Sequence, residues 1–194
     1  ARILTYFFLV MMVVFLVVSL FVDEIITFKF FGHSLIHQNY WSGLSIVPIV
    51  LADYMCLGIS TNMSAGIYIE KKTKWLPPIT FLGAGINVLV NFLLIPAYGI
   101  TGAAWATFCS YFLMALALYF ILQKIYPVEY EWKRILKIAI AGALAYALFI
   151  SFAVPQDTLV IKMGILALFV LILIMIKFFE PAELSTIFKI WKKV

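Results

Sequence analysis

The stretch Ile95–Thr107, IPAYGITGAAWAT, decides how the chain folds, because it puts a proline and two glycines between two long apolar runs. Pro96 has no N–H with which to continue a helix, and it moves the residue before it out of helical geometry. Gly99 adopts a positive φ at little cost, so the chain can reverse within a few residues. We therefore predict two neighbouring antiparallel helices joined by a tight turn on the outer side of a membrane, with Tyr98 at the boundary with water.

Small residues recur every four positions after this turn, at Gly102, Ala106 and Ser110. In lipid the hydrophobic effect does not drive helices together, so small residues that permit close backbone approach take over that role. A later apolar run repeats the pattern at Ala139, Ala143 and Ala147. We predict that both stripes pack against neighbouring helices.

The composition places the chain in a membrane. Of its 194 residues 65% are hydrophobic and 12% are charged, whereas a soluble domain has roughly 45–50% apolar and about 25% charged residues. The net charge of +5 does not indicate a nucleic-acid partner, because the basic residues are spread between apolar blocks. Cys56 and Cys109 lie inside apolar runs and provide neither a disulfide framework nor a metal-binding spacing.

Six runs are long enough for a helix that crosses ~30 Å of hydrocarbon, which takes about 20 residues. They are Ile3–Val22, Leu44–Ile69, Pro77–Ile95, Thr101–Leu122, Ile135–Val154 and Leu159–Phe179. The predicted fold is an all-α membrane bundle. It comprises four helices (1–122), a cytoplasmic loop (123–134), a final helix pair (135–179) and a short amphipathic tail helix on the cytoplasmic face (180–194).

The positive charges predict the orientation of these spans. All of the 14 lysines and arginines except Lys29 and Lys162 fall on one side of the predicted bundle. Cytoplasmic loops carry such an excess of basic residues, so we expect both ends of the segment to be cytoplasmic. The chain starts without a methionine, and we expect a longer transporter with a further lobe before it.

Three quoted segments carry a family resemblance: YWSGLSIVPIV, NMSAGIYIEKKTKWLP and NVLVNFLLIPAYGITGAAWAT. Together they resemble bacterial polysaccharide flippases of the multidrug/oligosaccharidyl-lipid/polysaccharide superfamily, and the resemblance covers nearly the whole chain. It implies the last six of about fourteen helices in a fold like that of the multidrug extruders. Those extruders share a similar turn, so the turn does not separate the two relatives.

The resemblance implies a function for the complete transporter. A polysaccharide flippase moves a polyprenyl-diphosphate-linked oligosaccharide from the cytoplasmic to the outer leaflet of the bacterial cytoplasmic membrane, by alternating access between two lobes. In the lipid-II relatives the last two helices form a groove for the lipid tail. The implied partners are the lipid-linked oligosaccharide, membrane lipids and the missing N-terminal lobe. A drug or cation extruder and a membrane scaffold without transport are the alternatives.

Polar side chains at helical spacing predict a substrate or ion pathway through the second, third and fourth spans. The candidates are Asp53, Ser60, Asn87, Asn91, Ser110 and Tyr111. Such residues either line an aqueous cavity or hydrogen-bond between helices, and the sequence leaves both roles open.

Asp53 is the sharpest candidate, because a carboxylate at a helix centre costs roughly 2.5–3.5 kcal/mol on insertion scales. It could bind a coupling proton or sodium ion, pair with a basic residue of the missing lobe, or stay hydrated near the outer surface. The basic residues Lys71, Lys72 and Lys74 could attract the diphosphate at the cytoplasmic mouth, although orientation alone also explains them.

No enzyme motif is present in the sequence, which has neither a nucleophile elbow nor a phosphate-binding loop. His33 and His37 are four residues apart, but no carboxylate or cysteine completes a ligand set, so a hydrated outer loop is the better interpretation. We therefore expect a transporter without a metal or other cofactor, apart from a coupling ion.

Overall fold

The structure is a computed structural model that describes residues 2–27, 29–30, 33–34, 38–151 and 159–178. Its helices are α1 (Arg2–Thr27), α2 (Val47–Ile69), α3 (Leu76–Ile125), α4 (Trp132–Ser151) and α5 (Leu159–Met175). The shorter elements are the 3-10 helices η1 (Gln38–Ile46) and η2 (Thr73–Trp75) and an antiparallel pair of two-residue strands, β1 (Lys29–Phe30) and β2 (His33–Ser34). The predicted tail helix (180–194) lies outside the described residues.

Among the described residues, four helices are long and apolar enough to cross a membrane: α1, α2, α3 and α4. The fifth, α5, is apolar but has only 17 residues. The predicted all-helical character is confirmed, and the four long apolar helices are compatible with a multi-pass membrane protein. The count of six crossings stays a prediction, in which α3 supplies two of them.

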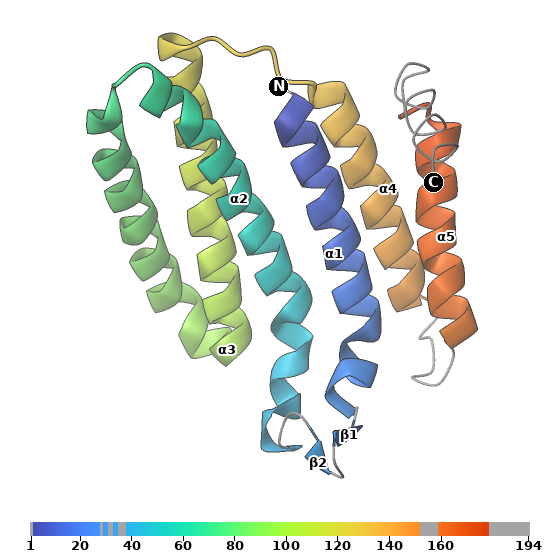
Figure 1. Cartoon of the computed structure of the whole chain (residues 1–194). Helices are drawn as coiled ribbons and strands as arrows, with labels where there is room; N and C mark the ends of the chain where they lie inside the picture. The colour runs from blue at the N-terminus through green and yellow to red at the C-terminus, as the bar shows by residue number, and fades with distance from the viewer. Residues whose placement is uncertain (1, 28, 31–32, 35–37, 152–158, 179–194) are drawn as a thin grey trace.

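Helix α3 folds back on itself within residues 95–107 (Figure 1). Its one non-helical residue is Gly99, with φ 54° and ψ −130°. We call residues 76–98 the first arm of α3 and residues 100–125 its second arm. The predicted reversal is confirmed, but its position differs from the prediction: Ile95 and Pro96 remain helical. A proline costs the first arm one N–H without ending it, whereas a residue with positive φ has to break the helix.

The two arms of α3 pack through the small residues that follow the turn. A Cβ on Gly102 would collide with the carbonyl oxygen of Leu94, so a larger side chain there would meet backbone. Ala106 is fully buried. The Ser110 hydroxyl donates a 2.7 Å hydrogen bond to the carbonyl of Gly83 on the first arm. This small-residue stripe therefore performs the predicted packing role.

The helices stand side by side in the order α3, α2, α1, α4, α5 (Figure 1). Helix α1 is central, and its core stripe repeats every four residues at Leu4, Phe8, Met12, Leu16 and Leu20. Glycines on both neighbours let α1 approach closely, because the space beside each is filled by an α1 side chain. These contacts are Gly58 of α2 with Phe7 and Gly142 of α4 with Met12.

Two sequence predictions about helix faces and ends were wrong. The predicted packing stripe of α4 includes Ala143 and Ala147, which are exposed. The buried face of α4 lies beside it, at Ile138, Ala141, Gly142 and Ala145, because periodic alanines alone do not show which face meets a neighbour. Helix α1 continues past the predicted end at Val22, through two acidic residues, because the charge of Glu24 is met by a lysine of α5.

Candidate functional site

Asp53 lies on the buried face of α2, which packs mainly against α3. Its side chain is 3% exposed, and its Oδ1 atom has no hydrogen-bond partner in the described part of the chain. Because Gly58 sits beside Phe7 in the antiparallel α1–α2 pair, Asp53 is level with about Met12, near the middle of α1. The structure therefore places this carboxyl group at mid-depth in the bundle.

The other polar residues of α2 bond to their own helix. The Ser60 hydroxyl donates to the carbonyl of Cys56 at 3.1 Å, and the Asn62 amide donates to the carbonyl of Gly58 at 2.9 Å. Back-bonding of this kind satisfies a short polar side chain at bilayer depth without water. Among the described residues, the polar stripe of α2 therefore reduces to one buried atom without a partner, the Oδ1 of Asp53.

Asn87 and Asn91 form a small network inside the α3 hairpin. The Asn91 amide donates to the side-chain oxygen of Asn87 at 2.9 Å, and the Asn87 amide lies 3.4 Å from the hydroxyl of Thr107 on the second arm. Both asparagines are half-buried, as is Tyr111, which follows Ser110 on the second arm. These bonds provide the interhelical packing role, and a role in an ion or substrate pathway stays a prediction.

The three lysines proposed at the cytoplasmic mouth are exposed in the turn after α2. Lys71 has φ 54°, its N–H donates to Tyr68 at 3.1 Å, and the N–H of Lys72 donates to Ile67 at 3.0 Å. This is the Schellman arrangement, in which a glycine usually occupies the left-handed position. Lys74 follows in η2. Their attraction for a diphosphate stays a prediction.

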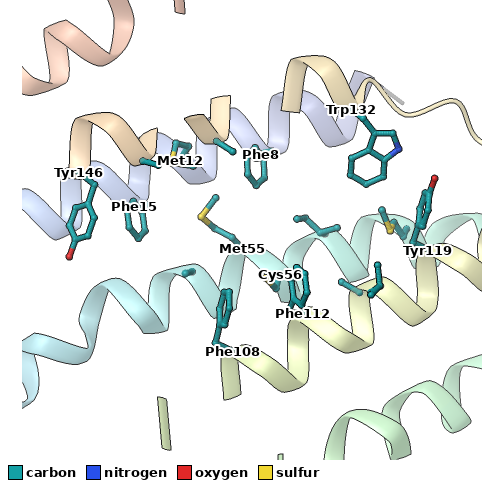
Figure 2. A pocket seen from close by; sticks show the side chains of 17 residues that line it. Phe8, Met12, Phe15, Met55, Cys56, Phe108, Phe112, Tyr119, Trp132 and Tyr146 are labelled. Atoms are coloured by element: carbon teal, nitrogen blue, oxygen red, sulfur yellow. The ribbon is translucent and has the colours of Figure 1, made fainter. Parts of the chain in front are cut away.

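An apolar cavity of about 550 Å³ lies between two helix pairs, and we call it the trough. One wall is formed by α1 and α4 and the other by α2 and the second arm of α3 (Figure 2). It is lined by Phe8, Met12, Phe15, Ala52, Met55, Cys56, Ile59, Met63, Phe108, Phe112, Ala115, Leu116, Tyr119, Trp132, Ala139, Ala143 and Tyr146. None of these lining residues is charged, and none is a predicted pathway residue.

Aromatic pairs mark the two ends of the trough (Figure 2). At the end near the α3–α4 loop, Tyr119 and Trp132 come from opposite walls and meet edge to face at 5.2 Å between ring centroids. At the other end, Phe15 and Tyr146 pair at 5.3 Å, but both belong to the α1–α4 wall. Burial, together with the neighbouring Tyr119, raises the pKa of the Tyr130 phenol in the loop above the first pair.

The side of the trough between α4 and the second arm of α3 is open, because in the described residues these two segments make no extensive contact with each other. A closed void of about 550 Å³ would cost on the order of 13 kcal/mol at ~24 cal/mol per Å³. That is comparable with the whole stability of a typical domain, about 5–15 kcal/mol. Because the trough is open on this side, apolar matter such as lipid can enter it, and no closed void of that cost has to form.

A buried ion pair joins α1 to α5 at the end of the bundle away from the α3–α4 loop. The side chain of Lys162 is 1% exposed, and its ammonium contacts a carboxylate oxygen of Glu24. The rings of Phe21 and Phe149 lie 5.7 and 6.0 Å from the ammonium. The sequence indicates Lys162 only as an outer-side charge and does not predict this partner. Glu24 is about 18 Å along α1 from the level of Asp53, too far for Lys162 to neutralise that carboxylate.

Charged residues also connect α1, α4 and the end of α5 at the opposite end of the bundle. Glu131 accepts a 2.8 Å hydrogen bond from Thr5 and pairs with Arg2 and Arg134. The ammonium of Lys137 donates to the carbonyl of Ile176 at 2.6 Å, beyond the last turn of α5. In the described part of the chain, no group of three histidine, cysteine, aspartate or glutamate side chains is arranged to hold a metal ion.

Comparisons with family models, with curated proteins and with solved structures gave no match. The trough is the feature that sequence reasoning missed, although aromatic residues and methionines at helical spacing on the first two spans could have indicated it.

Proposed function

We propose that the chain belongs to a transporter that moves a polyprenyl-diphosphate-linked oligosaccharide across the bacterial cytoplasmic membrane, for surface polysaccharide synthesis. The observation that carries this proposal is the uncharged trough between two helix pairs. A lipid-linked sugar differs from most transported solutes in having a long hydrocarbon chain that needs an apolar path. An open apolar trough in a chain with several membrane-crossing helices fits that need.

The main alternative, a drug or cation extruder, has one observation in its favour. Asp53 has a buried carboxylate oxygen with no hydrogen-bond partner among the described residues, as a cation site would require. The trough itself has no acidic lining residue with which to hold a cationic drug. We therefore assign Asp53 to coupling with a proton or sodium ion, and the trough to the lipid-linked substrate.

The proposal includes the arrangement inferred from the sequence: a further N-terminal lobe, both ends of this segment in the cytoplasm and no enzymatic activity. The test is to delete the gene in its source bacterium and measure both surface polysaccharide and drug tolerance. Loss of polysaccharide with unchanged drug tolerance, restored by the intact gene, supports the flippase. Unchanged polysaccharide with greater drug sensitivity would replace it with the extruder.

A further inference from the structure

We propose that the trough holds the phosphate-proximal segment of an isoprenoid chain, which belongs to a polyprenyl phosphate lipid in the leaflet nearest Trp132. This inference rests on the proposed function and deepens it by naming the part of the substrate that the trough binds. It differs from the groove that the family resemblance implies, since α4 lines the trough with α1, α2 and α3 and not with α5.

The trough is at least as long as one leaflet of a bilayer is thick. Along α2 it extends from Ala52 to Met63, and along α3 from Phe108 to Tyr119. Each interval is about 16 Å at 1.5 Å per residue, and half of a ~30 Å hydrocarbon core is about 15 Å. The lining residues Met63 and Tyr119 lie six residues before the ends of α2 and α3, and along α4 the trough extends from Trp132, beside the α3–α4 loop, to Tyr146, about 21 Å. A chain from the nearer leaflet can therefore occupy it fully.

The lining suits a chain of irregular width. Met12, Met55 and Met63 face the trough from α1 and α2. Methionine is unbranched and flexible, so it adapts to irregular apolar shapes. An isoprenoid chain carries a methyl branch in every unit and has such a shape.

Charge at the loop end complements the phosphate of such a lipid. Lys124 and Lys133 are exposed on either side of the loop, one residue before the end of α3 and one after the start of α4. Glu131, one of the loop's two glutamates, is already engaged by Arg2 and Arg134. An anionic head at this end, with its uncharged chain in the uncharged trough, leaves no charge buried.

The pair of Tyr119 and Trp132, which we call the aromatic bridge, determines how the chain enters the trough. Tyr119 and Trp132 close the loop end from opposite walls, whereas the side between α3 and α4 is open. The chain therefore enters sideways from the bilayer and passes beside the aromatic bridge, and its phosphate stays outside the trough at the loop end.

Photo-crosslinking of the complete gene product tests this inference. Benzoylphenylalanine is placed at Ala143 or Leu116, which line the trough, and at the control positions Leu144 and Leu113, which are exposed beside them and do not line it. The protein is reconstituted in vesicles of phosphatidylethanolamine and phosphatidylglycerol with a minor fraction of polyprenyl phosphate. Mass spectrometry of the adducts gives the ratio of polyprenyl phosphate to phospholipid at each position.

We expect this ratio to be several-fold higher at the two trough positions than at the two controls. Filling the trough with Ala139→Phe should return the ratio at Ala143 to the control value, with the thermal melting of the protein showing that the variant is folded. Equal ratios at all four positions, or adducts at trough positions to protein alone, would overturn the proposal. Because crosslinking does not need transport, enrichment in a protein that does not support polysaccharide export would refute only the proposed function.

Discussion

The ion pair between Glu24 and Lys162 gives a sharp quantitative prediction, because its two partners differ in exposure. The Lys162 side chain is 1% exposed, whereas that of Glu24 is 36% exposed. Glu24→Gln leaves a buried ammonium without its counter-charge, and breaking a buried pair in this way costs about 3–5 kcal/mol. Lys162→Met leaves the carboxylate of a side chain that is partly exposed, so we expect a smaller loss.

The double variant Glu24→Gln/Lys162→Met should recover most of the loss caused by Glu24→Gln alone. Replacing a buried pair by apolar or neutral groups of similar size is often neutral, since the desolvation penalty disappears together with the attraction. Phe21 and Phe149 already lie around the ammonium and would contact the methionine. The predicted order of stability is therefore parent and double variant first, Lys162→Met next and Glu24→Gln last.

Equilibrium unfolding in mixed micelles of mild detergent and dodecyl sulfate measures these free energies for the four proteins. The coupling energy follows from the double-mutant cycle. If the losses of the two single variants simply added in the double variant, the pair would contribute no coupling and the reasoning would fail. A Glu24→Gln variant as stable as the parent protein would refute the claim that Glu24 supplies the counter-charge of the buried ammonium.

Three further predictions use single substitutions. Gly102→Leu should strongly lower the amount of folded protein, because the new side chain meets backbone of the first arm of α3. Gly85→Leu is the control and should not lower it, because the space beside Gly85 is open. Equal melting temperatures of the two variants would refute the close approach at Gly102. Lys71→Gly should stabilise the protein by about 1 kcal/mol, since a left-handed residue with a Cβ is strained; an unchanged or lower free energy of unfolding would contradict this. In the complete transporter, Asp53→Asn should impair surface polysaccharide per amount of protein more than Asn87→Ala does, and full activity of Asp53→Asn would exclude a coupling role for its charge.

The sequence was a good guide to the helices and to one of their joints. The six apolar runs predicted helices where the structure has α1 to α5, with α3 covering two of the runs, since each helix satisfies its own backbone in lipid. Gly99 predicted the reversal within α3, because glycine is the residue that adopts a positive φ without strain. The end of α1 could not be predicted, because it depends on Lys162, which is far away in the sequence.

Polarity was a poorer guide to the candidate site. Ser60 and Asn62 are polar in the sequence, yet their hydrogen bonds return to the backbone of α2, so they require no aqueous cavity. Ser110 requires no aqueous cavity either, because its hydroxyl donates to the carbonyl of Gly83 and joins the two arms of α3. Only the tertiary structure separates these satisfied groups from Asp53, whose Oδ1 atom has no hydrogen-bond partner within the described residues.

The trough could not be predicted from polarity, because its lining has the composition of any lipid-facing surface. Its existence depends on spacing: α1 packs on α2 and on α4, while α4 and the second arm of α3 stay apart below the aromatic bridge. A chain that transports a hydrocarbon tail needs a gap of this kind, and apolar residues leave no polar pattern by which the sequence would reveal it. Under the function that we propose, the carboxyl of Asp53 and the uncharged trough have separate tasks: the carboxyl would bind the coupling ion, and the trough would accommodate the chain of the lipid-linked substrate.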